Sequence, residues 1–121
     1  MKLIYHITTL EDWAAAQAVG QIEAASLATE GFIHCSRQRQ LLNVANRFFP
    51  GAEDLLVLAI DETAVLPWLV NEGPAGKGDP FAADVFPHVY GPIPLAAVVG
   101  VARLVVDSDG RFEWPPELAH R

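Results

Sequence analysis

Hydrophobic residues change their spacing several times along the chain, and each spacing predicts a different kind of element. Short runs rich in β-branched and aromatic residues are typical of strands. Such runs occupy residues 3–7, 32–35, 55–60, 68–71, 86–90 and 99–106. The run at 55–60 is apolar throughout and lies between two aspartates, which is typical of a strand buried on both faces. We therefore expect this strand to be central in a sheet.

Two other segments carry apolar residues at helical spacing. The first follows a pair of threonines whose hydroxyls can cap a helix; Glu11 can complete a capping box, and Gly20 can end the helix. The second covers residues 37–49, where apolar side chains recur at intervals of three, four and seven. Ser36 is its expected N-cap and Pro50 marks its end. The sequence thus predicts two principal helices.

The remaining segments are expected to be loops and turns. Residues 26–30 form a polar stretch that predicts an irregular loop, and residues 95–98 predict one helical turn. The segment 73–83 is rich in glycine and proline, and we expect a surface loop that could act as a lid over a site. Residues 107–110 predict a turn, and the tail 115–121 is expected to be frayed.

The order strand, helix, strand, helix, then mostly strands is not the regular alternation of a doubly wound sheet. It predicts an α+β domain in which two principal helices pack on a small, curved and mainly antiparallel set of strands. The chain of 121 residues fits a single domain spanning 1–121. Because 51% of the residues are hydrophobic, that domain can bury a core without a disulfide or a structural metal.

Charge and cysteine content exclude several classes of protein. The net charge of −7 repels phosphate backbones, and only Arg37 and Arg39 approach a basic cluster, so a broad nucleic-acid surface is not expected. Cys35 is the only cysteine, which rules out an internal disulfide and a paired-cysteine zinc site. The first residues do not resemble a signal peptide and no apolar run could span a bilayer. We therefore expect a cytoplasmic location and no membrane partner.

Three histidines are the strongest candidates for chemistry, because each lies in or beside a predicted strand. His6, His34 and His88 are each followed closely by a polar or turn residue, and strand ends that face loops usually carry functional sites. Imidazole titrates near neutral pH and can donate, accept or bind metal, and a small core seldom needs three of them. A catalytic zinc held by the three histidines is one open interpretation, although they lack the spacing of ligands on one helix.

Strand alternation separates the neighbours of these histidines. Because adjacent strand residues point to opposite faces, His34 and Cys35 cannot both face a site, and we expect the cysteine in the core. Ser36 would share the face of His34, or cap the helix that follows, or do both. Tyr90 shares a face with the third histidine and could stack on a planar ligand ring. Glu72 is the best-placed carboxylate before the glycine-rich loop.

The sequence contains no P-loop, dinucleotide-binding glycine fingerprint or nucleophile elbow, which argues against kinases, Rossmann dehydrogenases and ordinary serine hydrolases. Three other motifs resemble those of the bacterial family called domain of unknown function 952, and the resemblance covers nearly the whole chain. The motifs are Ile4-Tyr5-His6-Ile7-Thr8, Ser26-Leu27-Ala28-Thr29-Glu30-Gly31-Phe32-Ile33-His34-Cys35-Ser36 and Phe86-Pro87-His88-Val89-Tyr90-Gly91-Pro92. The resemblance implies an ADP-ribosyltransferase-like fold, a split β-core with flanking helices in which NAD lies in a cleft between two small sheets.

The resemblance also implies roles for individual residues. His6 would hold a ribose, His34 would lie beside the nicotinamide, and His88 would take the position where a glutamate is expected. Glu72 follows Asn71 where family members usually have a tryptophan, and it is the candidate carboxylate. The candidate catalytic residues are therefore His6, His34, His88 and Glu72, and the candidate substrate-binding residues are Thr8, Ser26, Phe32, Ser36 and Tyr90.

The function implied by the resemblance is binding of a small nucleotide-like ligand, either NAD as a substrate or a related nucleotide or phosphate ester, with glycosyl or phosphoryl transfer. A resident cofactor or metal is not part of this expectation. Two alternatives stay open: a non-catalytic nucleotide-binding or sensing module, and a metal-dependent hydrolase that uses the three histidines.

Overall fold

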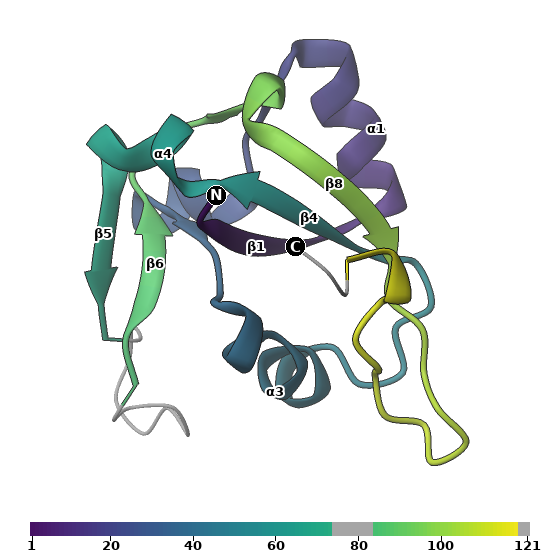
Figure 1. The fold of residues 1–121 in the computed structure, drawn as a ribbon. Helices are drawn as coiled ribbons and strands as arrows, with labels where there is room; N and C mark the ends of the chain where they lie inside the picture. The colour runs from purple at the N-terminus through teal and green to yellow at the C-terminus, as the bar shows by residue number, and fades with distance from the viewer. Residues whose placement is uncertain (74–83, 119–121) are drawn as a thin grey trace.

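A three-stranded antiparallel sheet lies at the centre of the computed structural model, which describes residues 1–73 and 84–118 (Figure 1). Its strands are β1 (Leu3–Thr9), β4 (Leu55–Asp61) and β8 (Val98–Arg103), in the order β1-β4-β8. The prediction of a central buried strand is confirmed, because β4 lies between the other two and all its residues except the last are buried.

The two faces of this sheet bury different side chains, and each face is covered by one helix. In one core cluster, β1 and β4 pack with α1 (Leu10–Val19) through Ile4, Leu58, Ile60 and Ala16. In the other, the same strands pack with α3 (Gln38–Phe48) through Tyr5, Val57, Ala59, Leu41 and Ala45. Successive strand residues alternate between the faces, as the pleat requires. The two predicted principal helices are therefore present.

The ends of α1 are set by a side-chain cap and a glycine. Thr9 Oγ1 accepts the backbone N–H of Asp12 at 3.0 Å, so Thr9 is the N-cap. The capping box predicted for Glu11 is wrong, because a helix that starts at Leu10 has Asp12 at its third position. Gly20 ends the helix with a φ of +97°, a left-handed conformation that favours glycine.

The start of α3 lies one residue later than predicted. Arg37, not Ser36, is the N-cap, and the backbone N–H of Arg37 donates to Gln40 Oε1 at 2.8 Å. The predicted cap at Ser36 is wrong because its backbone pairs elsewhere: Ser36 and Tyr5 exchange two N–H···O bonds of 2.8 Å. This bridge attaches the segment after β3 (Ile33–His34) to β1.

A second antiparallel sheet carries three of the predicted site residues, His34, His88 and Glu72. Its strand order is β3-β6-β5, with β6 (Phe86–Val89) between β3 and β5 (Leu69–Glu72). In this register His34 of β3 lies directly opposite His88 of β6. Figure 1 shows β5 and β6 running side by side next to the central sheet.

The prediction of an irregular loop at 26–30 is wrong. These residues belong to α2 (Ala25–Glu30), a short helix without a side-chain cap at its start. It ends at Gly31, whose φ of +89° lets its N–H donate to the carbonyls of Ser26 and Leu27 at 3.1 Å each. Six residues are too few for a helical spacing of apolar positions to show in the sequence.

The remaining elements are short. They are β2 (Gln21–Ile22), paired with β7 (Ile93–Pro94), and the helical turns α4 (Glu62–Val65), η1 (Leu66–Trp68), η2 (Leu95–Ala97) and η3 (Pro116–Leu118). The predicted turn at 107–110 is present and places Gly110 at a φ of +79°. The tail expected to be frayed is instead packed as far as Leu118, which is buried in the core cluster beside α3.

Two further expectations concern the segment before β6 and the membrane. The expected lid at 73–83 lies outside the described residues, apart from Gly73. Along the described ranges, no helix is long and apolar enough to cross a bilayer. What the structure describes is an α+β arrangement with antiparallel sheets and few helices, as the order of elements predicted.

Candidate functional site

One face of the second sheet is covered by aromatic and imidazole rings. His34 and His88 lie opposite each other, with ring centroids 5.4 Å apart. Phe32 shares their face because it lies two residues before His34, and it stacks on His88 with centroids 4.0 Å apart and planes 17° apart. Tyr90 lies 5.2 Å from Phe32. We call these four side chains the ring face: Phe32, His34, His88 and Tyr90.

A carboxylate lies at the edge of the ring face. Glu72, the last residue of β5, accepts hydrogen bonds at Oε1 from His88 Nδ1, at 2.8 Å, and from the Tyr90 hydroxyl. The bond from Tyr90, followed by the bond from His88, holds the pKa of Glu72 below its ordinary value, and the same contact raises the pKa of Tyr90. With 36% of its side chain exposed, Glu72 is an ionised and oriented carboxylate that a ligand can reach.

The first turn of α3 anchors both strands that carry this network. Arg37 donates to Asn71 Oδ1 at 2.8 Å, one residue before Glu72. The buried Gln40 donates to the Val85 carbonyl at 2.7 Å, just before β6 begins. Sequence reasoning misses this positioning role, because the contacts join residues far apart in the chain.

His34 is an exposed member of the ring face. About half of its side chain (51%) is accessible, and its Nε2 bonds to the Glu30 carboxylate at the end of α2. Phe32 packs edge-on against it at 4.8 Å between centroids. The imidazole of His34 can therefore contact a ligand directly, whereas His88 is buried and bonded to Glu72.

His6 lies in a different environment, on β1 of the central sheet. It is buried, and its Nδ1–H donates to the backbone carbonyl of His34 at 2.7 Å. Burial lowers the pKa of His6 below its ordinary value. The ring is therefore neutral at neutral pH, with its proton on Nδ1 and with Nε2 as an acceptor. His6 links β1 to β3 through this bond but lies apart from the ring contacts of His34 and His88.

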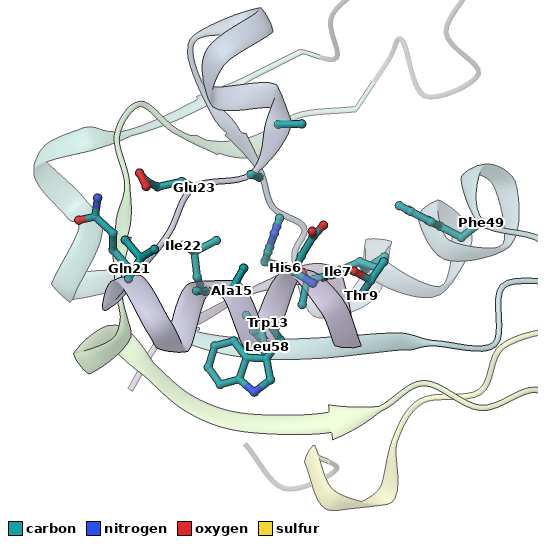
Figure 2. Close-up of a pocket in the computed structure, with 16 residues that line it drawn as sticks. His6, Ile7, Thr9, Trp13, Ala15, Gln21, Ile22, Glu23, Phe49 and Leu58 are labelled. Carbon is teal, nitrogen blue, oxygen red and sulfur yellow. Dashed lines mark hydrogen bonds between the residues drawn. The ribbon is translucent and has the colours of Figure 1, made fainter.

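A pocket of about 520 Å³ opens beside His6 and is lined by residues of β1, α1, β2 and the start of α2. We call it the His6 pocket. Figure 2 shows His6 in the middle of the lining, with Phe49 on one side and Gln21 and Glu23 on the other. Thr8, a predicted substrate-binding residue, also lines it. Among the described residues, the ring face and Glu72 take no part in the lining, so seven of the nine predicted site residues fall into two neighbouring regions, and Ser26 and Ser36 belong to neither.

Known proteins share this fold. A family model described as "Protein of unknown function (DUF952)" matches residues 7–101. The chain belongs to this family. It is similar to protein CC0527 from Caulobacter crescentus, whose X-ray crystal structure shares 34% identity over 93% of this chain and 94% of that chain, with a TM-score of 0.79. The solution NMR structure of CC0527 shares 34% identity over 92% and 91% of the two chains, with a TM-score of 0.76. No curated protein matches the chain.

In this DUF952 chain, the predicted orientation of Cys35 is confirmed. Cys35 is buried in the core cluster beside α1, whereas His34 faces outward on the ring face. Burial raises the pKa of the thiol to about 12, so Cys35 is not a thiolate nucleophile at neutral pH. Ser36 is also buried, and its backbone is bonded to β1. Ser26 lies in α2 and is not brought into the described pocket lining or ring contacts.

The zinc interpretation gains no geometric support in the DUF952 chain. Over the ranges 1–73 and 84–118, no group of three His, Cys, Asp or Glu side chains is placed to hold a metal ion. One ring nitrogen of each predicted ligand already bonds to an oxygen: Nδ1 of His6 to a carbonyl, Nδ1 of His88 and Nε2 of His34 to carboxylates. The three histidines thus serve three different contacts.

Sequence reasoning misses three carboxylates of this DUF952 chain. Glu30, the partner of His34, lies within the quoted second motif, four residues before His34, so its position was visible in the sequence. Asp12 and Glu23 line the His6 pocket. Neither belongs to a motif, and they approach one pocket only because α1 and β2 fold around β1.

Proposed function

We propose that this chain binds NAD, or a related nucleotide or phosphate ester, on the ring face and catalyses glycosyl or phosphoryl transfer there, with Glu72 as its carboxylate. The observation that carries the proposal is the setting of Glu72, an ionised and partly exposed group held by His88 and Tyr90 beside stacked rings. In the pattern that the resemblance implies, His88 takes the position of an expected glutamate. In this proposal the carboxylate of Glu72, which is bonded to His88, supplies the negative charge in its place.

The charge of Glu72 suits the cleavage of a bond between nicotinamide and ribose. Nicotinamide leaves with the bonding electron pair, and the ribose carbon, which carries positive charge in the transition state, then bonds to an acceptor, which is water when NAD is the only substrate. An anion fixed nearby favours that transition state. The two hydrogen bonds from His88 and Tyr90 orient the carboxylate before any ligand arrives. A protonated histidine would oppose the same charge, so His88 fits the role of a positioning residue for Glu72.

The rings beside Glu72 supply a surface for a planar ligand group. His34 and Tyr90 are both exposed, and the Phe32 ring contacts both of them as well as His88. Planar bases and nicotinamide stack on such rings at little entropic cost, because the rings are already held in place. In this proposal the imidazole of His34 contacts the leaving group, and Tyr90 contributes its ring.

The strand arrangement supports an ADP-ribosyltransferase-like fold as part of the same proposal. The sheets β1-β4-β8 and β3-β6-β5 are both antiparallel and are joined by the bridge between Tyr5 and Ser36. Such a pair of small sheets matches the split β-core that the resemblance implies. Because a shared fold does not establish a reaction, the proposed activity rests on Glu72.

A thermal-shift measurement with NAD, ADP-ribose and AMP tests the binding step. A ligand present at about 100 times its Kd adds about 2.7 kcal/mol to the stability of the folded chain. We expect NAD or one of the other two to raise the melting temperature in this way. The absence of a shift with all three would contradict a nucleotide site.

Release of nicotinamide from NAD tests the chemical step. We expect Glu72→Gln to lower the rate about 10²- to 10³-fold, because it removes the charge that favours the transition state. The control is Glu113→Gln, an exposed glutamate outside the ring face, which should leave the rate unchanged. Binding of NAD to the unsubstituted chain without release would instead identify the sensing module.

A further inference from the structure

The His6 pocket has a charge of one sign. The charged residues among its lining are Asp12 and Glu23, and none of the described lining residues is a lysine or an arginine. Both carboxylates are exposed to solvent at the pocket. A phosphate or carboxylate ligand would meet two negative groups there without a compensating cation, whereas a positive group would be attracted.

A buried histidine in the lining of the pocket offers a hydrogen-bond acceptor. His6 is only 7% exposed and lines the pocket, and its Nδ1 is committed to the His34 carbonyl at 2.7 Å. In the part of the chain that the structure describes, only Nδ1 of this ring takes part in a hydrogen bond, so Nε2 stays available in the pocket lining. Because the ring is neutral, Nε2 can accept a hydrogen bond from a ligand that carries an N–H or O–H group.

Most of the remaining lining residues are apolar. Trp13, Ile22, Phe49 and Leu58 contribute hydrophobic surface, and Figure 2 shows them spread around His6. A volume of about 520 Å³ lies within the range of small-molecule sites, which are mostly apolar with a few placed polar groups. The lining thus matches a ligand with an apolar body and a hydrogen-donating, positively charged head.

We propose that the His6 pocket binds an organic cation, an ammonium or amidinium group on an apolar body. Asp12 and Glu23 attract the charge, and Nε2 of His6 accepts one N–H of the head group. This site is separate from the ring face and goes beyond the proposed function, because it takes a ligand of opposite charge to a nucleotide. Neither proposal depends on the other.

Three probes of one shape and different charge test the proposal: benzylammonium, benzyl alcohol and benzoate. Their Kd values can be measured at neutral pH by following backbone amide shifts in NMR titrations. We expect benzylammonium to bind tightest, by up to about fivefold over benzyl alcohol for each carboxylate engaged, and benzoate to bind weakest. The shifts should fall on lining residues such as Thr8, Thr9 and Ile22. Equal or tighter binding of benzoate, or no saturable binding of benzylammonium, would overturn the proposal.

Variants separate the two polar contributions. The double change Asp12→Asn with Glu23→Gln should abolish the preference for benzylammonium over benzyl alcohol. His6→Asn keeps a donor for the His34 carbonyl but removes Nε2, and it should weaken both probes about two- to tenfold. The matched control is Glu11→Gln, which removes an exposed carboxylate beside Asp12 that does not line the described pocket.

A preference that survives the double change would show that the carboxylates do not select the charge, and this would overturn the proposal. Glu72→Gln should leave benzylammonium binding unchanged, since Glu72 belongs to the other region. Failure of the probes to bind would therefore leave the NAD measurements on the ring face unaffected, and failure with NAD would leave this site unaffected.

Discussion

The ring face and the His6 pocket differ in how far their polar groups are already satisfied. At the ring face, His88 and Tyr90 both bond to Glu72, and the neighbouring rings pack against one another. The His6 pocket instead holds about 520 Å³ of open space, and Nε2 of His6 has no partner among the described residues. Oriented chemical groups and open volume are thus supplied by different elements, β5 and β6 in one case and α1 and β2 in the other.

We expect the largest change in stability from a substitution that removes a packed ring from the ring face. Phe32→Ala removes a ring that is only 6% exposed and stacks on His88, so we expect the free energy of unfolding to fall by about 3–5 kcal/mol. Urea denaturation measures the change. The matched control is Phe48→Ala, which removes a half-exposed ring and should cost about 1 kcal/mol or less. Equal losses for the two variants would show that the stacked rings add little.

The second largest change is expected at Gln40, which anchors the ring face but not the His6 pocket, so its substitution distinguishes the two regions. Gln40→Ala leaves the Val85 carbonyl and the Arg37 N–H without their partner, and it should lower the free energy of unfolding by about 1–3 kcal/mol. Chemical denaturation checks this against Gln17→Ala on the exposed surface of α1, for which we expect little change. In the Gln40 variant, amide shifts should change around β5 and β6 and stay constant around His6.

A smaller effect concerns the pH dependence of stability contributed by His6. Its pKa is lowered in the folded chain, so between that value and the ordinary value of about 6.5 the unfolded chain binds more protons. The part of the free energy of unfolding that comes from keeping His6 neutral is therefore fully present above about pH 6.5, and it is lost as the pH falls below that value. Unfolding measured from neutral to acidic pH should show a shallower dependence for His6→Asn than for the unsubstituted chain. Parallel curves would mean that His6 is not held neutral by burial.

The smallest expected effect concerns the acid response of Glu72. Hydrogen bonds from Tyr90 and His88 lower the pKa of Glu72 in the folded chain. Its contribution to the free energy of unfolding is therefore present above the ordinary pKa of about 4.3, and it is lost as the pH falls through the lowered pKa of the folded chain. Glu72→Gln should remove this part of the acid destabilisation, and Glu113→Gln should not. Acid titrations of the three proteins, followed by circular dichroism, would compare them. Identical acid midpoints would indicate that the network leaves the carboxyl unperturbed.

Features that depend on neighbours in the chain could be predicted from the sequence. The apolar run of β4 shows its burial on both faces, and the alternation between His34 and Cys35 assigns one to the surface and the other to the core. Both depend only on the period of a strand, which the sequence displays directly. The helix α2 escapes prediction, because it has neither a side-chain cap nor enough length for a periodic pattern.

Features that depend on register and packing could not be predicted. Glu72 meets His88 because β5 pairs with β6 so that Glu72 lies opposite Phe86. A slip of one residue would turn Glu72 to the other face of the sheet, and nothing in the sequence of either strand fixes that register. The His6 pocket likewise depends on how α1 and β2 fold around β1, so Asp12 and Glu23 carried no visible signal.

The most direct test of the division between the two regions is an NMR titration of the full chain with NAD. We expect backbone amide shifts to concentrate on the ring face, at Phe32, His34 and Tyr90, and we expect Glu72→Gln to leave their location unchanged. Shifts confined to the lining of the His6 pocket, at residues such as Thr8 and Thr9, would contradict this expectation, because the nucleotide would then occupy the region assigned here to cations.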